Sequence, residues 1–182
     1  MAIAPLPLSR RGRILFITLL LLAVAIWIIG LYCYSMLPKE VPTQFGFSGE
    51  PTHYGAKSTF LLLPALSSLF AIVILLVARF LFTLFSKYPY MLNLPAFFTY
   101  IFQIPEQRRG LWLNRYFEAV LGLGIAITLY LMLLMVGGFE GSASGTLPSW
   151  FASAAILFPI GVIVPFLYIM AMLSRQMKRE VI

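Results

Sequence analysis

The side chains that could carry out chemistry are few, and most of them lie in one loop. His53 is the single histidine, Cys33 is the single cysteine, and the chain has no aspartate. Glu40 and Glu50 precede His53 in the loop, but a stable zinc site takes three or four good ligands, so this set would hold a metal ion only weakly. A Ser-His-Asp triad lacks its aspartate unless a glutamate replaces it. The sequence therefore predicts no catalytic residue, no metal site and a protein that is not an enzyme.

Composition places the chain in a lipid bilayer. Of its 182 residues, 61% are hydrophobic and 10% are charged, and the mean hydropathy is +0.94. Soluble domains are about 45–50% apolar and about 25% charged, and a soluble core of this size cannot bury so much apolar surface. A soluble enzyme, a disordered tail and a disulfide-rich secreted module are excluded, the last also because a single cysteine forms no intrachain disulfide.

Four uncharged segments, at 14–31, 60–78, 119–136 and 150–173, are long enough to cross a hydrocarbon core of about 30 Å. Backbone groups in lipid must pair within their own segment, so each should be a helix. The first is too long for the apolar region of a signal peptide, which has about 7–15 residues, and should be retained. We predict an all-α, single membrane domain over residues 1–182, with spans at about 14–36, 58–83, 115–138 and 149–173, an outer loop at 37–57 and an inner connection at 84–114.

Charge predicts the orientation of these spans. If the four spans alternate, 11 of the 13 basic residues fall on the side that holds both termini and the inner connection. The positive-inside rule places that side in the cytoplasm. Arg108, Arg109 and Arg115 would form a basic cytoplasmic surface. The pI of about 9.8 then reflects topology and contact with anionic lipid rather than binding to nucleic acid.

The inner connection contains an apolar face at helical spacing. With Pro95 at its first position, the segment is typical of a short amphipathic helix in the membrane interface, in contact with lipid or a partner. A re-entrant element packed between helices is the alternative. The face comprises Leu94, Phe97, Phe98, Ile101 and Phe102.

A second helix start follows in the same connection. Pro105 and Glu106 place a proline and an acid in a first turn, so a helix should run from there without a break into the third span. Arg115 and Glu118 on that extension are three residues apart and could pair.

Prolines and small residues within the spans predict how the helices pack. Pro64, Pro159 and Pro165 should kink their helices. Gly122 and Gly124 in the third span, and residues 152–155 in the fourth, are small enough to allow close helix contact.

Prolines and glycines also shape the outer loop. Because proline fixes φ and glycine permits positive φ values, the loop should be a set of fixed turns. Within it, we expect an extended stretch at 41–47 that turns back at 46–49. These residues are Pro38, Pro42, Pro51, Gly46, Gly49 and Gly55.

The outer loop resembles the signature of a known family. Its motif is formed by Leu37, Pro38, Val41, Pro42, Phe45, Gly49, Tyr54, Gly55 and Lys57. The pattern is similar to that of the domain-of-unknown-function 1648 family of small bacterial and archaeal membrane proteins. Asn93-Leu94-Pro95 and Pro105-Glu106 resemble a subgroup of it. The family's histidine and aspartate positions are Gln44 and Thr52 here, so a metal or proton site in the family motif would be lost in this chain.

This resemblance implies a multi-pass protein of a bacterial or archaeal cytoplasmic membrane. The family is related to SdpI-type immunity proteins, which implies a sensor or immunity protein that meets a ligand with the outer loop and a regulator with Arg108, Arg109 and Arg115. Our first hypothesis is instead a non-enzymatic accessory subunit that contacts other membrane subunits and lipid. A small transporter or channel is a third hypothesis, disfavoured because the span cores hold no ionisable residue. No cofactor is implied, and a bound lipid or pigment stays open.

Overall fold

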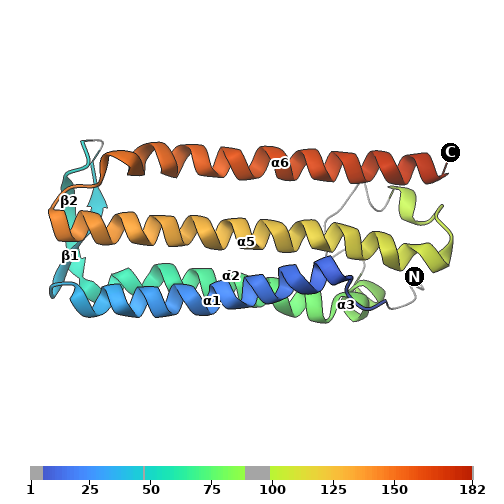
Figure 1. Ribbon diagram of the computed structural model, residues 1–182, viewed down its shortest axis with the longest axis horizontal. Helices are drawn as coiled ribbons and strands as arrows, with labels where there is room; N and C mark the ends of the chain where they lie inside the picture. The colour runs from blue at the N-terminus through green and yellow to red at the C-terminus, as the bar shows by residue number, and fades with distance from the viewer. Residues whose placement is uncertain (1–5, 47, 89–98, 182) are drawn as a thin grey trace.

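The computed structural model describes residues 6–46, 48–88 and 99–181. The elements in chain order are α1 Arg10–Met36, β1 Glu40–Phe45, β2 Pro51–Ala56, the 3₁₀ helix η1 Lys57–Leu61, α2 Leu62–Arg79, α3 Leu81–Lys87, α5 Glu106–Ser144 and α6 Ser149–Val181. Figure 1 shows the long helices side by side, with the β1–β2 hairpin at one end of the molecule. At the other end α1 begins and α6 ends, and we call these the hairpin end and the terminal end.

Within the described residues, four helices are long and apolar enough to cross a membrane, as the hydropathy pattern predicts. They are α1, the continuous pair of η1 and α2, α5, and α6. At 1.5 Å per residue, the 39 residues of α5 extend about 58 Å, well beyond a hydrocarbon core of about 30 Å. Its first residue is Glu106, with Pro105 at the N-cap, which confirms the predicted helix start.

Local signals account for the other helix ends. The hydroxyl of Ser9 accepts a hydrogen bond from the Gly12 N–H at 3.0 Å and caps α1. Gly145, at φ 80°, closes α5 in the left-handed conformation that glycine adopts without strain. The predicted second span, 58–83, corresponds to η1, α2 and the start of α3, with a break in the helix at Phe80.

The prolines in the spans differ in their effect. Pro64 was expected to kink a helix, but it lies in the first turn of α2, where no intrahelical partner exists for its nitrogen. Pro159 and Pro165 lie inside α6, which continues through both.

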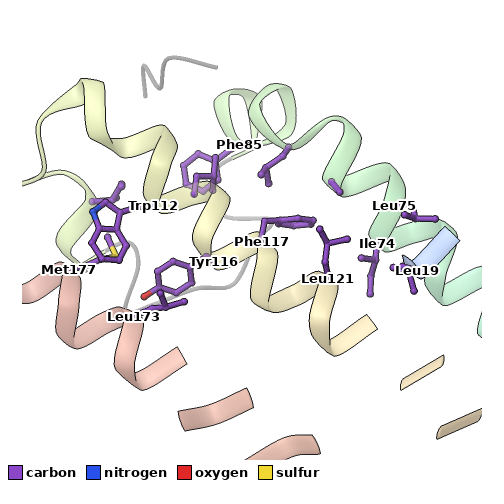
Figure 2. Packing of buried hydrophobic residues seen from close by; sticks show 14 of the residues in the cluster. Leu19, Ile74, Leu75, Phe85, Trp112, Tyr116, Phe117, Leu121, Leu173 and Met177 are labelled. Carbon is purple, nitrogen blue, oxygen red and sulfur yellow. The ribbon is translucent and has the colours of Figure 1, made fainter. Parts of the chain in front are cut away.

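Helices α1, α2 and α5 pack against one another, whereas α6 packs chiefly against α5. The larger core cluster lies toward the terminal end, and Figure 2 shows Trp112, Tyr116, Leu173 and Met177 at the contact of α5 with α6. A smaller cluster near the hairpin contains Ile26, Cys33, Leu37, Val41, Phe60 and Met135.

The two predicted contact glycines of α5 have different surroundings. A Cβ at Gly124 would lie 2.9 Å from Ile74 Cδ1 and 3.1 Å from Leu19 Cδ2, so this glycine lets α5 approach both α1 and α2. A Cβ at Gly122 would meet nothing within 4 Å. Within this chain, the expectation of close helix contact is therefore confirmed for Gly124, whereas Gly122 faces open space and contacts no other helix.

Candidate functional site

The outer loop folds into the antiparallel β1–β2 hairpin, in agreement with the predicted extended stretch and turn. Pro42 pairs with Tyr54 and Gln44 with His53, so Thr43 forms a bulge in β1. Leu37 and Val41 are buried in the smaller core cluster beside Phe60. These two apolar motif residues therefore anchor the hairpin to the helices.

The glycines of the motif allow close backbone approach. Gly49 has φ 81°, and its carbonyl accepts a hydrogen bond of 2.8 Å from the Leu147 N–H in the α5–α6 connection. A Cβ at Gly55 would lie 2.9 Å from Cγ2 of Thr43 across the hairpin. A larger residue at either glycine would strain or displace the hairpin.

Phe45 and Lys57 connect the hairpin to α5 and α1, respectively. A Cβ on Gly141 of α5 would lie 3.0 Å from the Phe45 ring, so the ring rests on the helix backbone. The Lys57 ammonium lies 4.3 Å from the centre of the Tyr34 ring, a cation–π contact with the end of α1. Both residues hold the hairpin in place rather than offering a free surface.

The free surface of the hairpin is formed by other side chains. Tyr54 is 57% exposed, and Gln44, His53 and Pro38 are exposed as well. Among the residues that the structure describes, no group of three His, Cys, Asp or Glu side chains lies close enough to hold a metal ion. The exposed side chains of the hairpin thus include an aromatic ring and an imidazole.

At the terminal end, Glu180 ties the last turn of α6 to the start of α5. Its carboxylate accepts a hydrogen bond of 2.9 Å from the indole Nε1 of Trp112 and lies 3.0 Å from Nε of Arg108. Trp112 itself is buried. No local signal in the sequence indicated this role for Glu180, because its partners are about 70 residues away.

Arg109 stabilises the turn that precedes α5. Its guanidinium donates hydrogen bonds to the carbonyls of Ile104, at 3.0 Å, and Phe102, at 3.1 Å, and lies 3.4 Å from Glu106. Arg108 and Arg109 are therefore engaged within the chain, and the predicted basic surface is smaller than the sequence indicated.

The expected pair of Arg115 with Glu118 is wrong for the described residues, whose ion pairs are Arg108–Glu180 and Arg109–Glu106. Glu118 instead accepts a hydrogen bond from the hydroxyl of Ser9. The Arg115 guanidinium lies over the Trp112 ring, 4.9 Å from its centre. The reason is tertiary, because the start of α1 lies beside Glu118 and competes for it.

The predicted interfacial face falls mostly outside the described residues, since Leu94, Phe97 and Phe98 lie in 89–98. Of the other two residues, Ile101 is fully buried in the larger core cluster and Phe102 is 57% exposed. Ile101 therefore contacts protein and is not available to lipid or to a partner.

A groove runs between α5 and α6 beside the start of α1. Its volume is about 580 Å³, and Gly122, Ala126 and Gly161 line its apolar part. Polar side chains line its terminal end, namely Arg11, Arg115, Glu118 and Gln176.

The groove lies between two places where α6 is attached to α5. Toward the hairpin, the Tyr130 hydroxyl donates to the Ala155 carbonyl at 3.0 Å and the ring stacks on Phe158 at 5.5 Å. Toward the terminal end, Leu173, Met177 and Glu180 hold the helices together. The open stretch is thus a defined feature of the α5–α6 pair.

Comparison with known proteins decides the family. A family model described as a domain of unknown function, DUF1648, matches residues 21–67. An uncharacterized protein of Archaeoglobus fulgidus is 38% identical over 181 residues, which cover all of this chain and 99% of that protein. The chain belongs to the DUF1648 family. No solved structure matches it significantly.

In this DUF1648 protein, the matched segment runs from α1 through the hairpin into the second turn of α2. The resemblance that the loop motif indicated is thereby confirmed. The segment contains Leu37, Val41, Gly49 and Lys57, whose contacts hold the hairpin against the rest of the chain, and Gly55, which lets the two strands approach each other. The α5–α6 groove lies outside the matched segment.

Proposed function

We propose that this DUF1648 protein is a non-enzymatic accessory subunit of a larger membrane assembly, and that a transmembrane helix of a partner protein packs along α6 and the α5–α6 groove. The observation that carries the proposal is the exposure of α6. Only 6% of its most apolar stretch is buried, against 33% for the Lys57–Arg79 helix. A helix so little covered by its own chain has apolar area to offer to another protein or to lipid.

Small residues favour a helix over lipid as the occupant of the groove. Ala119, Gly122 and Ala126 follow one another at helical spacing on α5, opposite Gly161 of α6. Helix association in membranes depends on close packing, and small residues permit close backbone approach. Arg115 and Gln176 at the groove's terminal end could hydrogen-bond polar groups of the same partner.

In this proposal, the protein lies in the cytoplasmic membrane of a bacterium or archaeon, with the terminal end in the cytoplasm. The support is the charge distribution, since the helix ends at that end carry Arg10, Arg11, Arg13, Arg79 and Arg175 among other basic residues. The same charges meet lipid headgroups and the partner, not nucleic acid.

The test is extraction of the tagged protein from its native membranes in mild detergent, followed by a native gel and mass spectrometry. We expect stoichiometric migration with other membrane proteins. Migration alone, near 20.5 kDa plus detergent, would remove the proposal. Migration as a multiple of its own mass would make a second copy the occupant instead.

A pair of matched variants locates the contact. Gly122 lines the groove and Gly138 does not, yet a Cβ at either position on α5 would meet nothing within 4 Å. Gly122→Leu should abolish co-migration by filling the groove, whereas Gly138→Leu should leave it intact. Loss in both variants, or in neither, would contradict the placement of the partner.

The exposed hairpin surface favours a second candidate, a sensor or immunity protein of the SdpI type. Tyr54 and His53 are exposed although the motif around them is fixed to the helices, which suits a rigid surface that meets an external ligand. Under this alternative, the double variant Gln44→Ala and His53→Ala, or Tyr54→Ser alone, should abolish a protective or regulatory response in cells. Under the subunit proposal, these variants should leave co-migration unchanged.

A further inference from the structure

A second pocket, which shares no lining residue with the α5–α6 groove, lies at the terminal end between the start of α1 and the α2–α3 junction. Its volume is about 640 Å³. Arg13 of α1 and Arg79, the last residue of α2, line it together with Thr83 of α3. The rest of the lining is formed mostly by apolar side chains, which are Leu6, Pro7, Leu8, Phe16, Ile17, Ala78, Phe80 and Phe82.

The side chains that line this pocket carry only positive charge. No aspartate or glutamate is among the lining residues. The ion pairs of the described residues, Arg108–Glu180 and Arg109–Glu106, do not involve Arg13 or Arg79. The undescribed residues 1–5, 47, 89–98 and 182 include no acidic side chain that could neutralise the two arginines. Two guanidinium groups without a carboxylate suit a phosphate, which they can bind through paired hydrogen bonds.

The position of the two arginines along the helices matches the depth of lipid headgroups. Arg13 immediately precedes the uncharged run of α1, and Arg79 immediately follows that of α2. Phe16 and Ile17 lie on the membrane side of Arg13 and continue the pocket wall into the apolar part of α1. A free phosphate would leave this apolar wall uncovered, whereas a lipid fills both the charged and the apolar part.

The N-terminal wall of the pocket is held in place by α5. The Asn114 side chain, which is buried, donates a hydrogen bond of 3.0 Å to the Pro7 carbonyl. The Ser9 hydroxyl donates to Glu118. These bonds fix residues 6–9 against α5, so the pocket wall is formed before any ligand binds, which lowers the cost of binding.

We infer that this pocket binds the anionic, phosphate-bearing headgroup of a membrane lipid between Arg13 and Arg79, with a lipid chain along Phe16 and Ile17. The inference does not depend on the proposed partner helix, because the two sites share no residue. Binding here would link the start of α1 to the end of α2 at the membrane surface.

Native mass spectrometry of the full chain in mild detergent tests this inference. The probe is dioleoyl phosphatidylglycerol, with dioleoyl phosphatidylcholine as the neutral-headgroup reference. Because R13Q/R79Q removes the charge-assisted hydrogen bonds from both guanidinium groups to the phosphate, it should weaken phosphatidylglycerol binding by about tenfold or more. The control R10Q/R175Q removes two charges from the same end outside the pocket. It should change binding by less than about twofold, because it removes no hydrogen bond to the headgroup and exposed charges are screened by salt.

A second pair of variants keeps both arginines. Thr83→Glu introduces a carboxylate into the pocket, and Ser86→Glu places the same charge on the exposed surface of α3, outside the lining. We expect Thr83→Glu alone to weaken phosphatidylglycerol binding. Equal weakening by pocket and control variants would mean general attraction and would overturn the site. Equal binding of both lipids would overturn its charge selectivity, and displacement of the lipid by millimolar inorganic phosphate would make free phosphate the ligand.

Discussion

The indole of Trp112, in the second turn of α5, donates a hydrogen bond of 2.9 Å to the carboxylate of Glu180, next to the last residue of α6. Figure 2 shows Trp112 and Tyr116 on α5 facing Leu173 and Met177 on α6. The contact of α6 with α5 is therefore polar at its outermost point and apolar just inside it.

Loss of the Glu180 carboxylate should loosen the end of α6. Glu180→Ala leaves the buried indole N–H of Trp112 without its acceptor, and a hydrogen bond to a charged group contributes about 1.5–3 kcal/mol. We expect the free energy of unfolding in detergent to fall by about 1.5–3 kcal/mol, which lowers the thermal unfolding midpoint. The control, Glu106→Ala, removes an i,i+3 ion pair between the exposed Glu106 carboxylate and the largely buried Arg109 guanidinium and should cost about 0.5 kcal/mol or less. An equal effect of both variants would contradict a structural role for Glu180.

Gly55 should not tolerate a side chain while Thr43 is present. In Gly55→Ala the new Cβ would lie 2.9 Å from Thr43 Cγ2, and such overpacking costs about 1–3 kcal/mol. Thr43→Ser removes Cγ2 and keeps the hydroxyl that donates to the His53 carbonyl. The double variant should recover most of the loss in thermal stability. No recovery would place the strain in the backbone rather than in this contact.

The contrast between Gly124 and Gly122 predicts opposite responses to alanine. Gly124→Ala should destabilise the bundle by about 1–3 kcal/mol, because its Cβ would meet Ile74 and Leu19. Gly122→Ala adds a methyl group in open space and should be neutral or slightly stabilising. Ile74→Val removes the nearest atom and should partly rescue Gly124→Ala. Reversible unfolding in mixed micelles measures the three variants, and equal effects at the two glycines would argue against the α1–α2–α5 packing.

The adjacent serines of α2 differ in their partners. The Ser68 hydroxyl accepts a hydrogen bond from Nε1 of Trp27 on α1, whereas the fully buried Ser67 hydroxyl has no partner among the described residues. Ser68→Ala should cost about 0.6 kcal/mol, the average for interhelical hydrogen bonds in membranes. Ser67→Ala should be neutral or stabilising, since it removes a buried hydroxyl whose hydrogen-bonding capacity is unsatisfied among the described residues. The same unfolding assay compares them, and a larger loss at Ser67 would contradict the α1–α2 register.

Much of the architecture follows from local sequence. Four uncharged runs predict four spans because backbone groups in lipid must pair within a helix. Pro105 and Glu106 indicated the start of α5. The prolines and glycines of residues 37–57 indicated a folded loop, because proline fixes φ and glycine permits positive φ values. Each of these features is decided by neighbours in the chain.

The candidate sites depend on contacts that the sequence does not record. Ser9 meets Glu118, Trp112 meets Glu180, and Arg13 shares a pocket with Arg79 across more than 60 positions. Spacing alone paired Arg115 with Glu118, and this was wrong because α1 lies beside Glu118 and Trp112 lies beneath Arg115.

The sequence by itself determined the number of spans, the charge at each end and the family. Only the tertiary structure decided which faces meet, because helices apolar on every side carry no polar stripe that marks the side facing lipid. Close packing at small residues decides which faces meet, as at Gly124 of α5, which packs against Ile74 and Leu19. It leaves α6 attached near both ends and open between them, and it brings Arg13 and Arg79 to one pocket.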